Sequence, residues 1–110
     1  MAEEDFARLL AKARGFDWNP NKRNEVFRDR HIAFEDARTV FEGPITALRS
    51  DRKGETRYLV FGLLEDVEVA FVCTFRGDIC WIVMARRASR NERKKYYDRL
   101  ARGSASQDQK

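Results

Sequence analysis

The stretch that decides the fold runs from Cys80 to Leu100 and reads CWIVMARRASRNERKKYYDRL. Residues 80–85 form an apolar run with the length and composition of a buried strand. Two arginines follow this run, and we interpret them as a basic turn at the edge of a sheet. A rigid strand is therefore expected to deliver Arg86 and Arg87 to the surface, directly before a helix.

The second half of this stretch predicts a helix over residues 90–102. Ser89 and Glu92 have the spacing of a capping box, in which each side chain bonds the other residue's backbone N–H. Residues 86–102 include eight basic and two acidic side chains, a net charge of +6 against +4 for the whole chain. Charge concentrated in this way favours a contact with phosphate groups, although many charge runs only solvate a helix face.

The composition indicates one globular domain with an anionic partner. The chain has 110 residues and a pI near 9.3, which suits nucleic acid or an acidic protein. No run is apolar enough to cross a membrane and the acidic start does not resemble a signal peptide, so we predict a cytoplasmic protein. Cys73 and Cys80 are then expected to be reduced and buried. With His31 as the single histidine, we predict no metal site and no cofactor.

Helices precede strands in the predicted order. The spacing of Phe6, Leu9 and Ala13 indicates a first helix, and Asn19 followed by Pro20 indicates the start of the next. The expected helices are 2–14, 20–29, 34–41 and 90–102, and the expected strands are 45–50, 55–63, 67–76 and 79–85. Short links between strands favour antiparallel hairpins. We predict an α+β fold in which helices pack on a four-stranded antiparallel sheet, with a short fifth strand at 16–18 left open.

The predicted strands are apolar on both faces. Val69 and Phe71 alternate with Ala70 and Val72 along the third strand. Strands of this kind are covered on both sides. Helices can cover one face, and the other needs a further helix or another chain, which is a first indication of a protein partner.

Arg57 and His31 each have two interpretations. Arg57 lies early in an apolar strand, where a guanidinium needs either a carboxylate partner or a phosphate. Both roles are equally compatible with the sequence. His31 can move protons near neutral pH, but a histidine in a loop is more often a plain surface residue.

Glu92, Tyr96 and Tyr97 lie on the predicted last helix. Glu92 and Tyr96 are four residues apart, so they share a helix face near the arginine pair. A carboxylate and a phenol at that position could act as base, acid or positioning group in phosphodiester cleavage. The structural alternatives are that Glu92 only caps the helix and that both tyrosines only pack.

Five short motifs occur along the chain. They are FDWNPNK at 16–22, FEDARTVF at 34–41, ETR at 55–57, MARRAS at 84–89, and Glu92-Arg93 with Tyr96. Together, over about residues 16–97, they resemble the BrnT family, whose members are toxins of bacterial type II toxin–antitoxin modules. The chain departs from the usual family residues at Asn19, Val26, Ala33 and Met84. The usual Lys-His-Gly is replaced at residues 29–31, so that the histidine comes one position late.

The resemblance implies a RelE-like fold and an endoribonuclease that inhibits translation. It also implies a BrnA-type ribbon-helix-helix antitoxin as partner, with operator DNA bound only through that antitoxin, and a dimer is compatible with it. The toxin domain would span 16–102, after a helical extension at 1–15 and before a tail at 103–110 that its composition predicts to be disordered. The residues that match family motif positions are Arg57, Arg86, Arg87, Glu92 and Tyr96.

The function we expect is metal-independent RNA cleavage, by attack of a ribose 2′-OH on its neighbouring phosphate. The three arginines Arg57, Arg86 and Arg87 would share one pocket and stabilise the charge of the phosphorane. Two alternatives are a degenerate toxin that binds its antitoxin without cleaving, and a general nucleic-acid-binding helix with a steep salt dependence. The expected proton-moving side chains are Glu92, Tyr96 or His31, and the expected RNA-binding side chains are Arg90, Arg93, Lys94 and Lys95.

Overall fold

A mixed five-stranded sheet lies at the middle of the computed structural model, which describes residues 1–108 and the side chains of residues 1–102. In chain order its elements are α1 (Ala2–Lys12), β1 (Gly15–Trp18), α2 (Pro20–Arg30), the 3₁₀ helix η1 (Phe34–Asp36), α3 (Ala37–Glu42), β2 (Thr46–Arg49), β3 (Tyr58–Leu64), β4 (Val67–Arg76), β5 (Ile79–Arg87) and α4 (Arg90–Asp108). The strand order is β1-β5-β4-β3-β2. Strands β2 to β5 pair in antiparallel fashion, and β1 pairs parallel with β5. The α+β class and the four antiparallel strands are confirmed, and the fifth strand that the sequence left open is present as β1.

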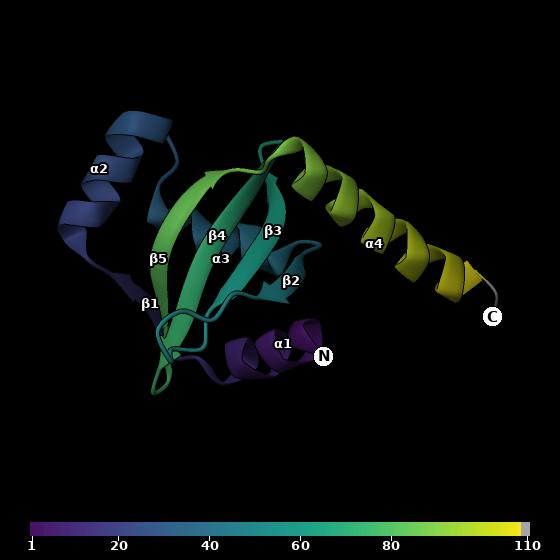
Figure 1. Ribbon diagram of the computed structural model, residues 1–110, viewed down its shortest axis with the longest axis horizontal. Coiled ribbons are helices and arrows are strands. Elements are labelled where there is room, and N and C mark those ends of the chain that lie inside the picture. The colour runs from purple at the N-terminus through teal and green to yellow at the C-terminus, as the bar shows by residue number, and fades with distance from the viewer. Residues whose placement is uncertain (109–110) are drawn as a thin grey trace.

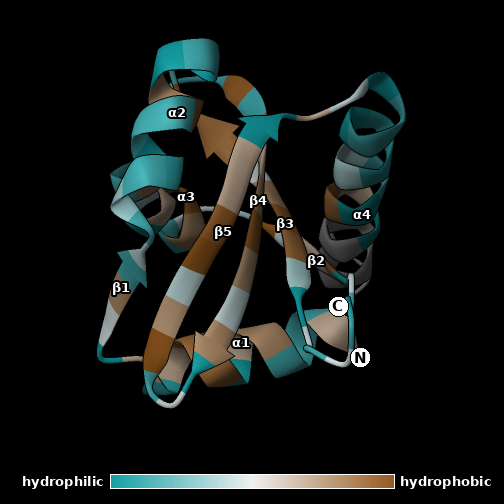
Figure 2. Cartoon of the chain, turned by 60° about the vertical axis from the view of Figure 1, so that its left-hand side comes forward, coloured by the Kyte–Doolittle hydropathy of each residue, from teal (hydrophilic) through white to brown (hydrophobic). Residues whose placement is uncertain are grey.

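One face of the sheet, which we call the core face, is covered by α1, η1 and α3, while α2 lies beside the edge of β5 and buries Val26 in the same core (Figure 1). Phe6 of α1 is fully buried there. Its ring centroid lies 5.3 Å from that of Phe41, 5.5 Å from that of Tyr58 and 5.8 Å from that of Phe75. Figure 2 shows the apolar strands at the centre and the hydrophilic α2 and α4 at the outside. The N-terminal helix is thus an integral part of the core.

The opposite face, which we call the open face, is covered in part by α4. Tyr96 of α4 packs there against Phe61 and Ala70 in a second, smaller core. In Figure 1, α4 leaves the sheet beyond β3, and no helix of the described chain lies in front of β4 and β5. Within the described residues the core face is therefore covered, as expected, whereas the open face is covered only in part.

Gly62 explains how closely α3 approaches the sheet. A Cβ atom at Gly62 would lie 2.5 Å from Val40 Cγ1 and 3.1 Å from Ile45 Cγ2. A glycine is needed because no side-chain atom fits between β3 and α3. The helix can then bury Val40 and Phe41 against the sheet.

The expected cap at Asn19 and the expected burial of both cysteines are confirmed. The Asn19 side chain caps α2 by accepting hydrogen bonds from the backbone N–H groups of Asn21 and Lys22 at 2.9 and 3.1 Å. Cys73 and Cys80 are buried and free. A hydrogen bond with the Cys80 thiol and burial raise the pKa of the Cys73 thiol above its ordinary value. No helix within the described residues is long and apolar enough to cross a membrane.

Some element boundaries differ from the expected ones. Helix α1 ends at Lys12, and the expected helix at 34–41 begins as the 3₁₀ turn η1. Strand β3 begins at Tyr58, so Arg57 precedes it, and β5 continues to Arg87. Helix α4 continues to Asp108. The predicted tail at 103–110 therefore overlaps α4 as far as 108, and its last two positions lie outside the described residues.

Candidate active site

Arg86 and Arg87 lie on opposite faces of the sheet. The basic turn expected at this point is wrong, because both residues belong to β5 and successive strand side chains alternate in direction. Arg86 is paired with Ala70, which lies under α4, and Arg87 is paired with Val69, which belongs to the larger core. The expected pocket that would hold both arginines is therefore absent from the described part of the chain.

Arg86 is engaged by Glu92. Its Nη1 and Nη2 atoms donate to the two Glu92 carboxylate oxygens at 2.6 and 2.9 Å, a two-pronged ion pair. The predicted capping box is confirmed, since the Ser89 N–H donates to Glu92 at 2.8 Å and the Glu92 N–H to Ser89 Oγ at 3.3 Å. These hydrogen bonds, chiefly those from Arg86, lower the pKa of Glu92 to about 2. A carboxylate with that pKa is a poor proton acceptor at neutral pH, so the pair serves mainly to join β5 to α4.

Arg57 lies on the open face, far from Arg86. It directly precedes Tyr58, which pairs with Cys73, whereas Arg86 pairs with Ala70. Along the strand direction, Arg57 and Arg86 are therefore about four residues apart, or roughly 13 Å. They are also two strand spacings apart across the sheet, because Arg57 lies directly before β3 and Arg86 lies in β5. Arg57 Nε donates to Glu55 Oε1 at 2.7 Å, so of its two interpretations the structure contains the carboxylate partner, which comes from the segment between β2 and β3.

Tyr96 is inside the small core under α4. Its side chain has no exposed surface, and its hydroxyl donates to the Pro44 carbonyl at 2.7 Å. Burial raises the pKa of Tyr96 above its ordinary value. The predicted role in moving protons does not fit this position, whereas the packing role does. Tyr97 is about half exposed (47%) and donates to Glu68 at 2.6 Å.

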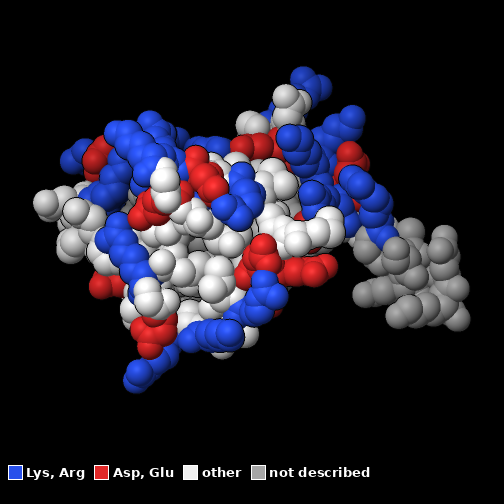
Figure 3. Space-filling view, turned by 60° about the horizontal axis from the view of Figure 1, so that its bottom comes forward, with Lys and Arg blue, Asp and Glu red and all other residues white. Residues whose placement is uncertain are grey.

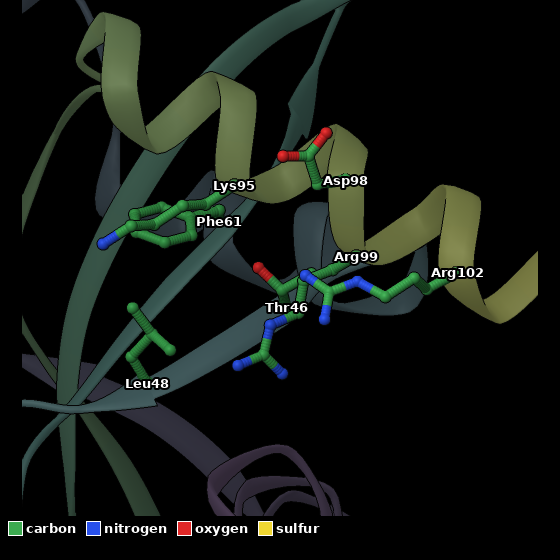
Figure 4. A pocket seen from close by; sticks show the side chains of 7 residues that line it. All are labelled: Thr46, Leu48, Phe61, Lys95, Asp98, Arg99 and Arg102. Atoms are coloured by element: carbon green, nitrogen blue, oxygen red, sulfur yellow. The ribbon is translucent and has the colours of Figure 1, made fainter.

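The four expected RNA-binding side chains are exposed on α4 but do not form one stripe. Lys95 points toward β3, into a hollow that it shares with Arg99 and Arg102 (Figure 4). Arg93 donates to the Ala88 carbonyl at 3.2 Å. Figure 3 shows the Lys and Arg side chains gathered along the described part of α4. The helix is basic around much of its circumference.

Arg87 and His31, by contrast, line the same pocket. This pocket lies at the end of the core face, between the last residues of α2, the β3–β4 turn and the end of β5, and its volume is about 220 Å³. We call it the His31–Arg87 pocket. Its floor is apolar and includes the buried side chains of Ile32 and Val69. Its polar lining consists of Arg30, His31, Glu65 and Arg87, all of which are exposed.

The charged groups of this pocket have no partners within residues 1–102. Arg30, Glu65 and Arg87 take part in no ion pair there, in contrast to Arg57 and Arg86. Two guanidiniums can bind the oxygens of a phosphate, and an imidazole and a carboxylate can each give or take a proton. The set therefore contains the groups that a phosphodiester cleavage requires.

Backbone conformation positions two of these groups. His31 ends α2 with φ 59°, and its N–H donates to the Phe27 carbonyl at 2.9 Å. Glu65 and Asp66, the two residues between β3 and β4, have φ values of 49° and 67°. Non-glycine residues adopt this left-handed region infrequently, and they concentrate at functional sites.

Arg30 and Glu65 line the pocket, but they are not among the functional residues predicted from the sequence. The neighbouring His31 is a weak signal for Arg30, because the two residues are adjacent. Glu65 has no such signal, since it reads as an ordinary charged turn residue. Within the described residues, no group of three or more His, Cys, Asp or Glu side chains is placed to hold a metal ion.

Comparison with known proteins agrees with the resemblance of the motifs. No curated protein matches the chain. A family model described as the ribonuclease toxin BrnT of type II toxin–antitoxin systems matches residues 18–92, which is more than half of the chain. The match includes the polar lining of the His31–Arg87 pocket and excludes α1 and most of α4. The chain belongs to the BrnT family of ribonuclease toxins.

Proposed function

We propose that this toxin cleaves RNA in the His31–Arg87 pocket and needs no metal ion to do so. The single observation that supports this assignment is that His31 and Arg87, which are far apart in the sequence, line the same pocket. Arg30 and Glu65 line it too, and neither forms an ion pair within residues 1–102. The other expected catalytic residues have internal partners, because Glu55 binds Arg57, Glu92 binds Arg86 and the Pro44 carbonyl binds Tyr96.

The proposed reaction is an internal transfer at phosphorus. The ribose 2′-oxygen attacks the adjacent phosphorus, the bond from phosphorus to the 5′-oxygen breaks, and a cyclic phosphate and a free 5′-OH result. His31 and Glu65 serve as the pair of proton carriers, one accepting the 2′-OH proton and the other donating a proton to the leaving oxygen. Arg30 and Arg87 stabilise the negative charge that grows on the phosphoryl oxygens.

The wider role proposed here follows the family. We propose a RelE-like toxin that acts on RNA in the cytoplasm, inhibits translation and is neutralised by a BrnA-type ribbon-helix-helix antitoxin. Operator DNA would be bound only through that antitoxin. The late position of the histidine, at His31, is compatible with activity because its side chain still lines the pocket.

A variant of His31 tests the site. Asparagine tolerates the left-handed backbone at this helix end, so His31→Asn should keep the fold while removing the imidazole. We expect its cleavage rate to fall about a hundredfold or more, which is the usual contribution of a proton carrier. The matched control is Lys53→Asn, at an exposed turn residue with φ 50°, which should cleave like the wild type. Equal rates for His31→Asn and the wild type would disprove the site, and antitoxin-free protein that leaves mixed RNA intact for hours would disprove the enzyme.

A second candidate function is antitoxin binding without cleavage. The ion pairs of Arg57 and Arg86 favour it, because they occupy two guanidiniums that match family motif positions. Expression of the toxin alone would then cause no growth arrest. Under the ribonuclease proposal, expression arrests growth and the Arg87→Ala change relieves the arrest.

A further inference from the structure

A row of aliphatic side chains crosses the open face. Leu48 of β2 pairs with Leu59 of β3, Leu59 pairs with Val72 of β4, and Val72 pairs with Met84 of β5. Residues paired in this way project from the same face of a sheet. Three strand spacings of about 4.8 Å make the row roughly 14 Å long.

A β-bulge widens the row at β5. The register shifts between Val72 and Cys73, so that Val83 is an extra residue opposite Val72. Val83 and Met84 both line a hollow of about 270 Å³ above Val72. Bulges of this kind re-aim side chains at functional edges of a sheet.

This row is partly exposed, because α4 covers only its β2–β3 end. Leu48 and Leu59 touch the small core beneath α4, whereas Val72 and Val83 belong to neither core and Met84 packs in part against the larger one. All five side chains are partly exposed. Figure 1 shows no helix of the described chain in front of this part of β4 and β5.

Basic side chains stand at both ends of the row. At the β2 end, Lys95, Arg99 and Arg102 line a hollow of about 240 Å³ together with Leu48 (Figure 4). At the other end, Lys22, Arg52 and Arg57 line the hollow that contains Val72 and Met84. Three of these six, Lys22, Arg57 and Arg99, form ion pairs with Glu25, Glu55 and Glu3, which do not line either hollow, and Asp98 is the one acidic residue of their lining. The other three, Arg52, Lys95 and Arg102, form no ion pair within residues 1–102 and supply the positive charge of the rim. The surface is therefore apolar along its middle and positive at its rim.

The row of aliphatic side chains on the open face favours a protein occupant over RNA. Single-stranded RNA is bound mainly by flat aromatic rings on which bases stack. Of the rings near this row, Phe61 is buried, and the Arg76 guanidinium covers one face of the Trp81 ring at 4.2 Å from its centroid. Aliphatic side chains of this kind instead receive the apolar face of an amphipathic helix.

We propose that the open face binds an acidic amphipathic helix of the antitoxin. Its apolar side chains would contact the row from Leu48 to Met84, and its carboxylates would face Arg52 and Lys95 at the two ends. A row of roughly 14 Å matches about ten residues of helix at 1.5 Å per residue. The proposal rests on the proposed toxin function only in taking an antitoxin as the partner, because the His31–Arg87 pocket lies on the other face.

The experiment measures, by calorimetry at low and at high salt, how tightly the toxin binds its antitoxin. The antitoxin is expressed from the reading frame beside the toxin gene, and overlapping synthetic peptides that cover its sequence are measured in the same way. In the full-length toxin, Arg52→Glu combined with Lys95→Glu reverses charge at both ends of the row, at two exposed residues. We expect about tenfold weaker binding or more, and a smaller salt dependence. The matched control, Lys12→Glu combined with Arg28→Glu, makes the same charge change at exposed residues away from this face and should bind like the wild type.

A variant within the row of aliphatic side chains gives an independent measure of antitoxin binding. Met84→Gln keeps the side-chain length and adds polarity at a partly exposed position, so it should fold and bind several-fold more weakly. Thermal unfolding of each variant verifies the fold. Acidic, amphipathic binding peptides would support the proposal, and basic or wholly polar ones would overturn it.

Two further outcomes separate this proposal from its alternatives. If the rim variants bind the antitoxin like the wild type but lose affinity for a single-stranded RNA oligonucleotide, the face binds RNA and the proposal is wrong. His31→Asn should bind the antitoxin with wild-type affinity. If it does so and also cleaves RNA normally, the cleavage site is wrong while the docking surface stands.

Discussion

Arg86 and Arg87 are adjacent in sequence, yet Arg86 binds Glu92 on the open face and Arg87 lines a pocket with His31 beside the core face. The division follows from strand geometry, because β5 continues through both residues and its side chains alternate. One arginine therefore stabilises the junction of β5 with α4, and the other, which forms no ion pair within residues 1–102, is the one that we propose to bind the RNA phosphate.

Alanine variants of these two arginines should have different effects, one on RNA cleavage and the other on stability. Arg87→Ala should lower RNA cleavage by about a hundredfold with little change in the free energy of unfolding, because an exposed side chain without a partner contributes little to stability. Arg86→Ala should destabilise the protein by about 1–3 kcal/mol, because it leaves the partly buried Glu92 carboxylate without its partner. Denaturant unfolding and cleavage per folded molecule measure the two effects. Loss of cleavage in folded Arg86→Ala, with normal cleavage by Arg87→Ala, would reverse the assignment.

The Arg86–Glu92 pair predicts a specific loss of stability in acid. The folded-state pKa of Glu92, about 2, lies below its ordinary value of 4.5, so its contribution is complete above about pH 4.5 and is lost as the pH falls toward 2. Removing this contribution should cost about 1–3 kcal/mol, since the Glu92 side chain is 17% exposed. The free energy of unfolding should therefore fall less between pH 7 and pH 3 for Glu92→Gln than for the wild type. The exposed Glu42→Gln is the control, and equal pH profiles for Glu92→Gln and the wild type would contradict the pairing.

Tyr96→Phe tests whether this tyrosine is structural. Removing the hydroxyl eliminates its hydrogen bond to the Pro44 carbonyl and should destabilise the protein by about 1 kcal/mol. Tyr97→Phe, which removes the more exposed hydroxyl bonded to Glu68, should cost less than that. Cleavage by either folded variant should match that of the wild type, and a large loss for Tyr96→Phe would give Tyr96 a catalytic role.

Gly62→Ala tests the close packing of α3 on β3. The added methyl group would lie 2.5 Å from Val40 Cγ1, so the helix or the side chain must move, and we expect a destabilisation of about 1–3 kcal/mol. Gly43→Ala is the matched control, because its nearest contact would be an ordinary 3.6 Å. A lower thermal midpoint for Gly62→Ala than for Gly43→Ala is the expected result, and equal midpoints would contradict the close approach.

The sequence predicts most of the fold, because hydrophobic periodicity and turn residues are local signals. The cap at Asn19, the hairpin strands and the capping box of Ser89 and Glu92 all follow from such signals. The parallel pairing of β1 with β5 does not, because it joins segments far apart in the chain. Strand ends are also poorly determined, since β5 continues wherever β4 still offers a partner, as Ala70 and Val69 do here.

The candidate site is less predictable than the fold. The two-residue extension of β5 is enough to separate Arg86 from Arg87, and no local pattern indicates it. Arg30 and Glu65 line the pocket at two left-handed positions of the backbone, since His31 ends α2 with a positive φ and Glu65 itself opens the β3–β4 turn with one. Such backbone states at non-glycine residues depend on long-range packing, which the sequence does not display.

The most direct test of the account is to locate bound RNA on the two faces of the sheet. Methyl NMR spectra of the toxin can be recorded with increasing amounts of a 2′-O-methyl RNA oligonucleotide, which cannot undergo 2′-OH attack. If RNA binds in the His31–Arg87 pocket, the methyl signals of Ile32 and Val69 should shift, and those of Leu59, Val72 and Met84 on the open face should change little. Shifts confined to the open-face methyl groups, with the pocket unchanged, would contradict RNA binding in the pocket.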